Sequence, residues 1–326
     1  MIRWKLPAAF LLLIVAAAAY YLFVYRPEHR LPEEFAYVLP DEAEVVDTPA
    51  EIRLDVATLK AGERVQVIAR TRNWAKVRLA DGRTGWIEAG ELLDAGTYEG
   101  GQRLLQGLAK ATVQATGHIY AAVNLRLEPS REAAVLAQLP QSEKVEVFDR
   151  RIVARPPEEG ESSSSTVNDV WYLVRADSRA GWILGKFVNL DIPEALSRYA
   201  QNSNIVAWLV LNTIDDEGRK VPQYVVADRV GTEEDFNRVR VFTWWAKNHE
   251  YVTAFAESRL NGHFPIRVTE IDHVPYFRLR LMDKDGHKFQ RVYGLFNTIT
   301  RPVGTVDGWE SQAMPAKPEP RRRRRR

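Results

Sequence analysis

The chain of 326 residues contains two stretches of nearly the same sequence, and this repeat restricts its possible folds. The stretch "WAKVRLADGRTGW" at Trp74–Trp86 returns as "WYLVRADSRAGW" at Trp171–Trp182. Upstream, "GERVQV" at Gly62–Val67 returns in the same order as "SEKVEV" at Ser142–Val147. Self-similarity of this kind predicts two copies of one folding unit, each of roughly 60 residues and each burying its own apolar face.

Each copy has the alternation of short β-strands. In the first copy the run Lys76–Leu79 places Val77 and Leu79 on one side of an expected strand. Asp81-Gly82 follows, and this dipeptide indicates a hairpin because glycine accepts a positive φ. Short strands of this kind bury an apolar face by curling into a small barrel, so we expect an all-β protein with two small barrels.

Both copies resemble the bacterial SH3-like domain family, which recurs in exported cell-envelope proteins. The second copy carries the family pattern as "VNLRLEPS" at Val123–Ser130, followed by "SEKVEV", "WYLV" and "GWI". The first copy has "GWI" and the hairpin dipeptide, but it places Val46 where the second copy has Arg126. The resemblance implies one SH3-like barrel at 35–94 and another at 121–191.

The resemblance also implies a ligand and its site. In this family the tryptophan that opens the "WYLV" strand lies beside a groove between two long loops, and aromatic grooves of that kind bind extended peptides. The implied ligand is the peptide or bridge portion of peptidoglycan, or another envelope protein. Trp86 and Trp182 are expected in the barrel cores. The expected ligand-binding residues are Trp74, Trp171, Tyr172, Arg126 and, outside the barrels, Trp244.

Two segments interrupt or join the copies. The second copy is longer at 149–170, where "RRIVARPPEEGESSSSTVND" is rich in Pro, Glu and Ser and predicts a flexible inserted loop. Such a loop would cover or enlarge the second groove, so we do not expect the two copies to bind alike. Between the copies, 95–120 has a helical period, which predicts a short helical linker that fixes the barrels relative to each other or docks on a partner.

The pattern changes at 192–303, where longer alternating runs are separated by turn residues. Seven strands with short turns are expected, one of the turns at Asn261-Gly262, and they predict an antiparallel β-meander that forms an open sheet or a barrel. The run Tyr276–Met282 predicts one buried and one wet face. Because Trp244 and Trp245 are adjacent on a strand, one of them should face solvent or a ligand.

No catalytic constellation is expected. The chain has no cysteine, which excludes disulfides and cysteine nucleophiles, and it lacks G-x-S-x-G and P-loop motifs. "DKDGH" at Asp283–His287 lacks the downstream glutamate of a calcium loop. We therefore expect no enzyme, no metal site and no cofactor. The histidines of this region lack close ligand spacing; they are His249, His263, His273 and His287.

Residues 1–34 are expected to form a cytoplasmic stub, a membrane anchor and its flank. The run Pro7–Tyr25 holds no charge and, at about 1.5 Å per helical residue, nearly spans the ~30 Å hydrocarbon core. Arg3 and Lys5 precede it and favour a cytoplasmic amino terminus, so the bulk of the chain would be exported, in the periplasm or outside the cell. The alternative is secretion after signal cleavage, for which Ala17–Ala19 supplies a site.

The segment 304–326 is expected to be an extended, proline-containing tail that ends in six arginines. The formal net charge is +2, so the chain without these arginines is acidic. Such a run either stays solvated or contacts an anionic surface, where each residue contributes about 1 kcal/mol. Nucleic acid is disfavoured because no aromatic residue is interleaved. The candidate contact residues are Arg321, Arg322, Arg323, Arg324, Arg325 and Arg326.

Taken together, these features predict a membrane-tethered, exported binding or scaffold protein. Two alternatives stay open. One is a cell-wall hydrolase with its catalytic site in the C-terminal domain. The other is a carrier of a small ligand or lipid, if the meander closes into a barrel around a cavity.

Overall fold

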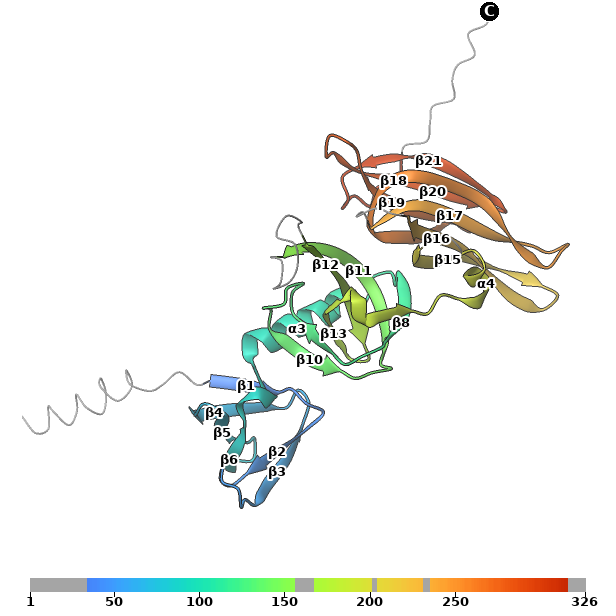
Figure 1. Ribbon diagram of the computed structural model, residues 1–326. Coiled ribbons are helices and arrows are strands. Elements are labelled where there is room, and N and C mark those ends of the chain that lie inside the picture. The colour runs from blue at the N-terminus through green and yellow to red at the C-terminus, as the bar shows by residue number, and fades with distance from the viewer. Residues whose placement is uncertain (1–33, 156–166, 201–203, 231–234, 316–326) are drawn as a thin grey trace, which may run out of the picture. The chain divides into compact units, whose positions relative to one another are not determined.

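The computed structural model describes residues 34–155, 167–200, 204–230 and 235–315. These residues form three antiparallel sheets of seven strands each, which confirms the predicted all-β class (Figure 1). The chain divides into two compact units, one ending at Ala95 and the other starting at Gly96. The expected anchor at Pro7–Tyr25 and the terminal arginines lie outside the described residues. Within the described part, no helix has the length and apolar character to cross a bilayer.

The first unit is a small curled sheet with the strand order β3-β2-β6-β5-β4-β1-β7. Its core is made by alternate residues of these strands, among them Val45, Val77 and Ile87, all fully buried. The expected hairpin between β5 and β6 is present, and Gly82 adopts φ +88° there. The strands are β1 (Glu34–Val38), β2 (Glu42–Val46), β3 (Asp55–Lys60), β4 (Arg64–Arg70), β5 (Trp74–Arg78), β6 (Thr84–Glu88) and β7 (Leu92–Asp94), with a 3-10 turn, η2 (Ala89–Glu91), before β7.

The second unit begins with a sheet whose order, β10-β9-β13-β12-β11-β8-β14, repeats that of the first unit strand for strand. The predicted duplication is therefore a duplication of the fold. Its strands are β8 (Ala115–Ile119), β9 (Val123–Arg126), β10 (Val135–Leu139), β11 (Lys144–Arg155), β12 (Val167–Ala176), β13 (Arg179–Leu184) and β14 (Val188–Leu190), with η3 (Gly185–Phe187) before β14.

The expected helical linker is shorter than predicted. The helix α3 (Ala95–Leu108) ends well before residue 120, and β8 already belongs to the second barrel. Ala115, Gly117 and Ile119 alternate into the core as a strand does, so the predicted linker at 95–120 extended too far toward the C-terminus. The helix packs on the second barrel, and a Cβ added at Gly100 would lie 2.8 Å from the Leu127 side chain.

The predicted flexible loop at 149–170 was wrong at both of its ends, and its middle, 156–166, lies outside the described residues. Strands β11 and β12 continue past the barrel, pairing from Asp149↔Leu173 out to Arg155↔Val167. We call this two-stranded extension, residues 149–155 and 167–173, the arm. The strand was missed because the inward position between Phe148 and Ile152 is Arg150, and a charged residue that is buried in the fold looks solvent-exposed in the sequence.

The C-terminal domain is a seven-stranded meander in sequence order, as predicted, and it curls into a half-barrel. Its concave face is filled by a core that includes Phe236, Phe277 and Tyr293, each buried. A short helix, α4 (Glu194–Ser197), packs Leu196 against a second cluster on the same sheet. The strands are β15 (Asn204–Asp216), β16 (Arg219–Arg229), β17 (Phe236–Trp245), β18 (Glu250–Ile271), β19 (Val274–Met282), β20 (Lys288–Phe296) and β21 (Ile299–Asp307).

Two details of the predicted meander were wrong. Asn261-Gly262 is no turn, because β18 runs through it; Gly262 sits where a Cβ would approach the Phe236 ring to 2.2 Å, so glycine is needed for packing. The domain also does not end at 303, because β21 continues to Asp307. Beyond β21, the predicted tail still packs on the sheet: Arg278 donates to the carbonyl oxygens of Gln312 and Ala313 at 3.0 and 2.9 Å.

The second barrel and the meander are joined by buried polar contacts. Arg150 of the arm donates to Asp235 at 2.7 Å, and their side chains are 1% and 9% exposed. Gln114 donates to the carbonyl oxygen of Ile266 at 2.9 Å and accepts from its N–H at 2.8 Å. Buried polar groups placed with such pairing fix one relative position of the two parts, which explains why they form one unit.

Candidate functional site

An open groove lies on the outer face of the first barrel and contains Trp74. It crosses β3, β2, β6 and β5 and has a volume of about 390 Å³. The pairs Glu44↔Thr58 and Trp74↔Glu88 place these four side chains on one face of the sheet. Arg53, from the loop between β2 and β3, lies with its guanidinium carbon 5.4 Å from the Trp74 ring centre. We call this site the Trp74 groove; its lining is Glu42, Glu44, Val46, Arg53, Thr58, Trp74, Glu88 and Glu91.

The Trp74 groove is acidic. Four carboxylates face one guanidinium, and burial together with the charges of Glu88 and Glu44 raises the pKa of Glu91 above its usual value. Burial is the larger cause, and the two neighbouring carboxylates add to it, so a cation placed beside Glu91 would favour its charged form. A half-buried indole beside excess negative charge suits a ligand that brings an apolar surface and a cationic group.

The equivalent tryptophan of the second barrel is buried. Trp171 pairs with Leu184 as Trp74 pairs with Glu88, but Trp171 is only 1% exposed. The prediction that Trp171 lines an open groove is therefore wrong. The acidic positions differ as well: Leu184 replaces Glu88 and, in the 3-10 turn, Phe187 replaces Glu91. The two barrels thus differ at these positions, and that they do not bind alike stays a prediction.

The remaining predicted residues lie far from one another. Arg126 donates to the carbonyl oxygen of Ala133 at 2.6 Å and so holds the loop between β9 and β10. Trp244 is buried in the meander and donates to Asp216 at 2.9 Å, whereas Trp245 faces solvent at 45% exposure. One of these two adjacent tryptophans faces solvent, as predicted. The exposed residue is Trp245, whereas the residue predicted to bind a ligand is Trp244.

Both tryptophans expected in the barrel cores follow an inward-facing glycine and lie on the outer faces of their sheets. Trp182 is buried there, at 4% exposure, and Arg151 covers its ring at 4.9 Å. Trp86 is only half-buried, on the outer face between Gly85 and Ile87, which point inward. The prediction for Trp86 was wrong because a tryptophan after an inward glycine must point outward on a strand.

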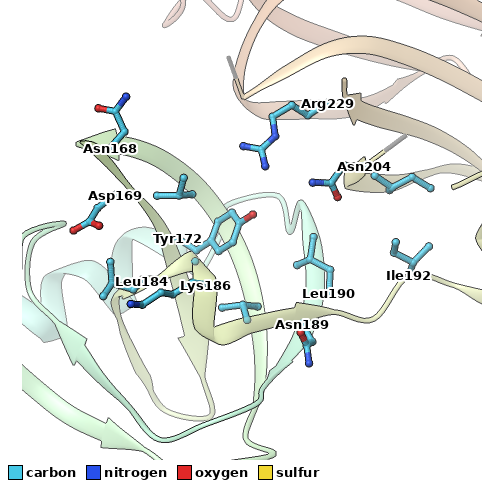
Figure 2. A pocket seen from close by; sticks show the side chains of 14 residues that line it. Asn168, Asp169, Tyr172, Leu184, Lys186, Asn189, Leu190, Ile192, Asn204 and Arg229 are labelled. Atoms are coloured by element: carbon cyan, nitrogen blue, oxygen red, sulfur yellow. The ribbon is translucent and has the colours of Figure 1, made fainter. Parts of the chain in front are cut away.

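Tyr172 lines a second, larger site of about 680 Å³, formed by the arm, the end of the second barrel and the first strands of the meander. Figure 2 shows the Tyr172 ring in this space, with Arg229 and Asn204 across from it. We call this site the Tyr172 pocket. Arg229 was not singled out from the sequence, because nothing in its local pattern indicates that β16 ends beside the second barrel.

A third site of about 560 Å³ lies between α3, the arm and β18, and it contains Asp149. Burial raises the pKa of Asp149 to about 6; the charge of Asp235 acts in the same direction, against the N–H of Arg150 and the charges of Arg151 and Arg280. The group therefore binds a proton more tightly in the folded than in the unfolded chain.

This difference predicts a pH dependence of stability. Between about pH 4 and 6 the folded chain holds more protons than the unfolded chain, so Asp149 reduces stability progressively as the pH rises. With a quarter of the side chain exposed (25%), we expect Asp149→Asn to raise the free energy of unfolding at pH 7 by about 1–2 kcal/mol. Urea unfolding at pH 7 and at pH 4 checks this, and the gain should vanish at the lower pH. An equal gain at both pH values would contradict it.

The two curled sheets define a protein built on duplicated SH3-like barrels. The family model of the bacterial SH3 domain matches residues 55–93 and 121–189, so the chain carries two bacterial SH3 domains, as the sequence pattern predicted. The matched residues do not extend into the meander. A comparison with curated proteins found no match.

Solved structures similar to this chain include three NlpC proteins. NlpC2 from Trichomonas vaginalis is 10% identical, with a TM-score of 0.18 and a match over 71% of this chain and 98% of the other. NlpC1 from the same organism is 9% identical, with a TM-score of 0.18 over 69% and 88%. An NlpC/P60 family protein from Bacillus cereus ATCC 10987 is 11% identical, with a TM-score of 0.20 over 69% and 99%. At these TM-scores the likeness carries no argument about function.

Proposed function

We propose that this protein is a non-catalytic binding protein of the cell envelope, whose first barrel binds a cell-wall peptide through the Trp74 groove. The observation that supports the proposal is the open groove itself: an accessible indole beside four carboxylates, on a bacterial SH3 domain. Peptides that cross-link cell walls carry free amino groups, and such a group would compensate the excess negative charge around Glu91. An envelope protein with a basic segment is the second candidate for the same groove.

The proposal includes export and retention at the membrane. Its support is the uncharged run Pro7–Tyr25 with Arg3 and Lys5 before it. A groove that faces the wall and an anchor in the membrane would make the protein a tether or scaffold between the two. The terminal arginines, Arg321–Arg326, would add contact with an anionic surface.

The two alternative functions have less support. A carrier needs a cavity inside the meander, but its concave face is filled by aromatic side chains such as Phe277 and Tyr293, whose rings stack at 4.9 Å. A hydrolase needs a catalytic constellation. The sequence has no cysteine nucleophile, and the described residues hold no group of three or more metal-ligating side chains. Release of soluble fragments from purified wall would favour the hydrolase.

Binding to purified peptidoglycan sacculi tests the proposed function. We expect the protein to co-sediment with sacculi, and Trp74→Ala to weaken this binding at least about tenfold, since a central tryptophan commonly contributes 2 kcal/mol or more to an interface. A salt series separates the groove from the terminal arginines, because charge–charge attraction of an exposed tail is screened at high salt. The binding that remains at high salt is the quantity to compare.

Trp245→Ala is the matched control. It removes a tryptophan that is 45% exposed on the meander, which belongs to the other unit and contributes no residue to the Trp74 groove, and it should leave binding unchanged. Sacculus binding by Trp74→Ala equal to that of the unmodified protein would overturn the proposal. No binding by any form would direct the search to a protein partner.

A further inference from the structure

The Tyr172 pocket contains a guanidinium, that of Arg229, which has no hydrogen-bonding partner among the described residues. Arg229 also forms no close ion pair with any residue in the described ranges. It is half-buried, and burial lowers its pKa; the positive charge of Arg150 acts in the same direction, against the charges of Tyr172 and the more distant Asp235. A desolvated guanidinium with five unused donors is costly for the fold unless an anion occupies the space before it.

Other donors surround the same space. The Tyr172 hydroxyl, which is also free of hydrogen bonds to described residues, and the Asn204 amide lie close to Arg229 in Figure 2. Lys186, on the 3-10 turn η3, adds an exposed ammonium at the rim. These groups come from the arm, the barrel end and two strands of the meander, so only the joined second unit assembles them.

Among the described lining residues, Asp169 is the one carboxylate, and it is already paired. Asp169 accepts from Arg131 at 2.6 Å and from Arg155 at 3.2 Å, and hydrogen bonds from these arginines hold its pKa below the usual value. These partners belong to the arm and to the loop between β9 and β10. No described carboxylate of the lining therefore pairs with Arg229 or Lys186.

Apart from Asn168, Gly185 and Asn189, the remaining lining is aliphatic and comes from both parts of the unit. A ligand that fills the site must combine one negative group with small apolar groups. A single guanidinium fork, one hydroxyl and one amide match a planar carboxylate and a neighbouring peptide group better than a tetrahedral phosphate, which usually recruits several cations or a row of backbone N–H groups. The aliphatic residues are Val170, Leu184, Val188, Leu190, Ile192 and Ile205.

We propose that the Tyr172 pocket binds the free carboxyl terminus of a peptide with small aliphatic side chains. Arg229 holds the carboxylate in a bidentate pair, and Tyr172 and Asn204 bind the carboxylate and the preceding peptide group. Leu190 and Ile192 contact the aliphatic side chains. This site is distinct from the Trp74 groove in residues, charge and ligand, and its occupation does not depend on that groove.

The test compares two forms of one probe on the full-length protein. N-acetyl-alanyl-alanine with a free carboxylate should bind in isothermal titration calorimetry, and the same dipeptide with a C-terminal amide should bind roughly tenfold more weakly or not at all. Arg229→Gln, which keeps the size of the side chain, should reduce binding of the free acid to the level of the amide. Lys186→Gln changes only an exposed rim residue, and it should weaken binding by a smaller factor.

Two control variants distinguish binding at the Tyr172 pocket from binding at the Trp74 groove. Arg301→Gln makes the same change at an exposed arginine of β21 and should bind the free acid normally, as should Trp74→Ala. Equal binding of acid and amide would overturn the proposal, and so would unaltered binding by both Arg229→Gln and Lys186→Gln. Displacement of the free acid by an equal concentration of inorganic phosphate would overturn the assignment to a peptide carboxylate. Binding of the free acid at the Tyr172 pocket is expected whether or not Trp74→Ala loses its binding to sacculi.

Discussion

Arg150→Ala is expected to lower the free energy of unfolding of the second unit by about 3–5 kcal/mol. The substitution leaves Asp235 as a buried carboxylate that keeps the N–H of Phe264, at 3.0 Å, as a hydrogen-bond donor, with the His263 ring at 3.9 Å. An uncompensated charge that stays away from water is among the most destabilising changes in a protein core. Urea unfolding followed by tryptophan fluorescence measures the effect, since most tryptophans belong to this unit.

Arg151→Ala is the matched control for this prediction. Arg151 is the next residue of the same strand, but its side chain is 60% exposed and lies over the Trp182 ring. Arg151→Ala should lower the free energy of unfolding by less than about 1 kcal/mol. The double variant Arg150→Met, Asp235→Leu should be more stable than Arg150→Ala, because it removes both charges together. A destabilisation of equal size in Arg150→Ala and Arg151→Ala would refute the role of the buried pair.

The second large effect is expected from Trp171. Trp171→Ala should destabilise the second unit by about 3–5 kcal/mol, because the indole is buried and its removal leaves a cavity. Trp74→Ala, at the equivalent position of the first barrel, should lower the free energy of unfolding much less, since that indole is half-buried beside an open groove. Thermal and urea unfolding of the two variants would measure the difference.

The contrast between these two variants matters for any binding experiment. Reduced binding by Trp171→Ala would reflect loss of folded protein, whereas reduced binding by Trp74→Ala would reflect loss of a contact. Circular dichroism of each variant before the binding measurement separates the two causes. Equal stability of Trp171→Ala and the unmodified protein would show that the indole is not part of the core.

The sequence predicted the barrels because their strands are local. Hairpins such as the one at Gly82 are specified by a few adjacent residues, and the alternation on each side gives the inward face. The same local pattern could not distinguish Trp74 from Trp171. Their neighbours along the chain are alike, and their exposure differs because of what packs on each outer face. That packing is set by residues distant in the sequence.

Prediction of the meander from local sequence failed at two places for the same reason. Gly262 resembled a turn residue, but its small size serves the approach of Phe236 from another strand. The strand β21 was missed because it contains Pro302 and Gly304, which weaken a strand pattern but are tolerated where the strand lies at a sheet edge. Of the predicted ligand-binding residues, Tyr172 lines a pocket, and its part in binding stays a prediction. Its partner Arg229 is brought there by the docking of two domains, which no local pattern reveals.

In both barrels the first and last strands are neighbours: β1 pairs with β7 through Ala36↔Asp94, and β8 pairs with β14 through Gly117↔Leu190. The chain therefore enters and leaves each barrel at adjacent points of one edge. A module connected in this way can be copied within a gene without displacing the segments on either side of it, because the gap it spans is short. The repeated tryptophan stretches are what such a copying step would leave in the sequence, and the burial of Trp171 leaves the accessible indole at this position to the first copy.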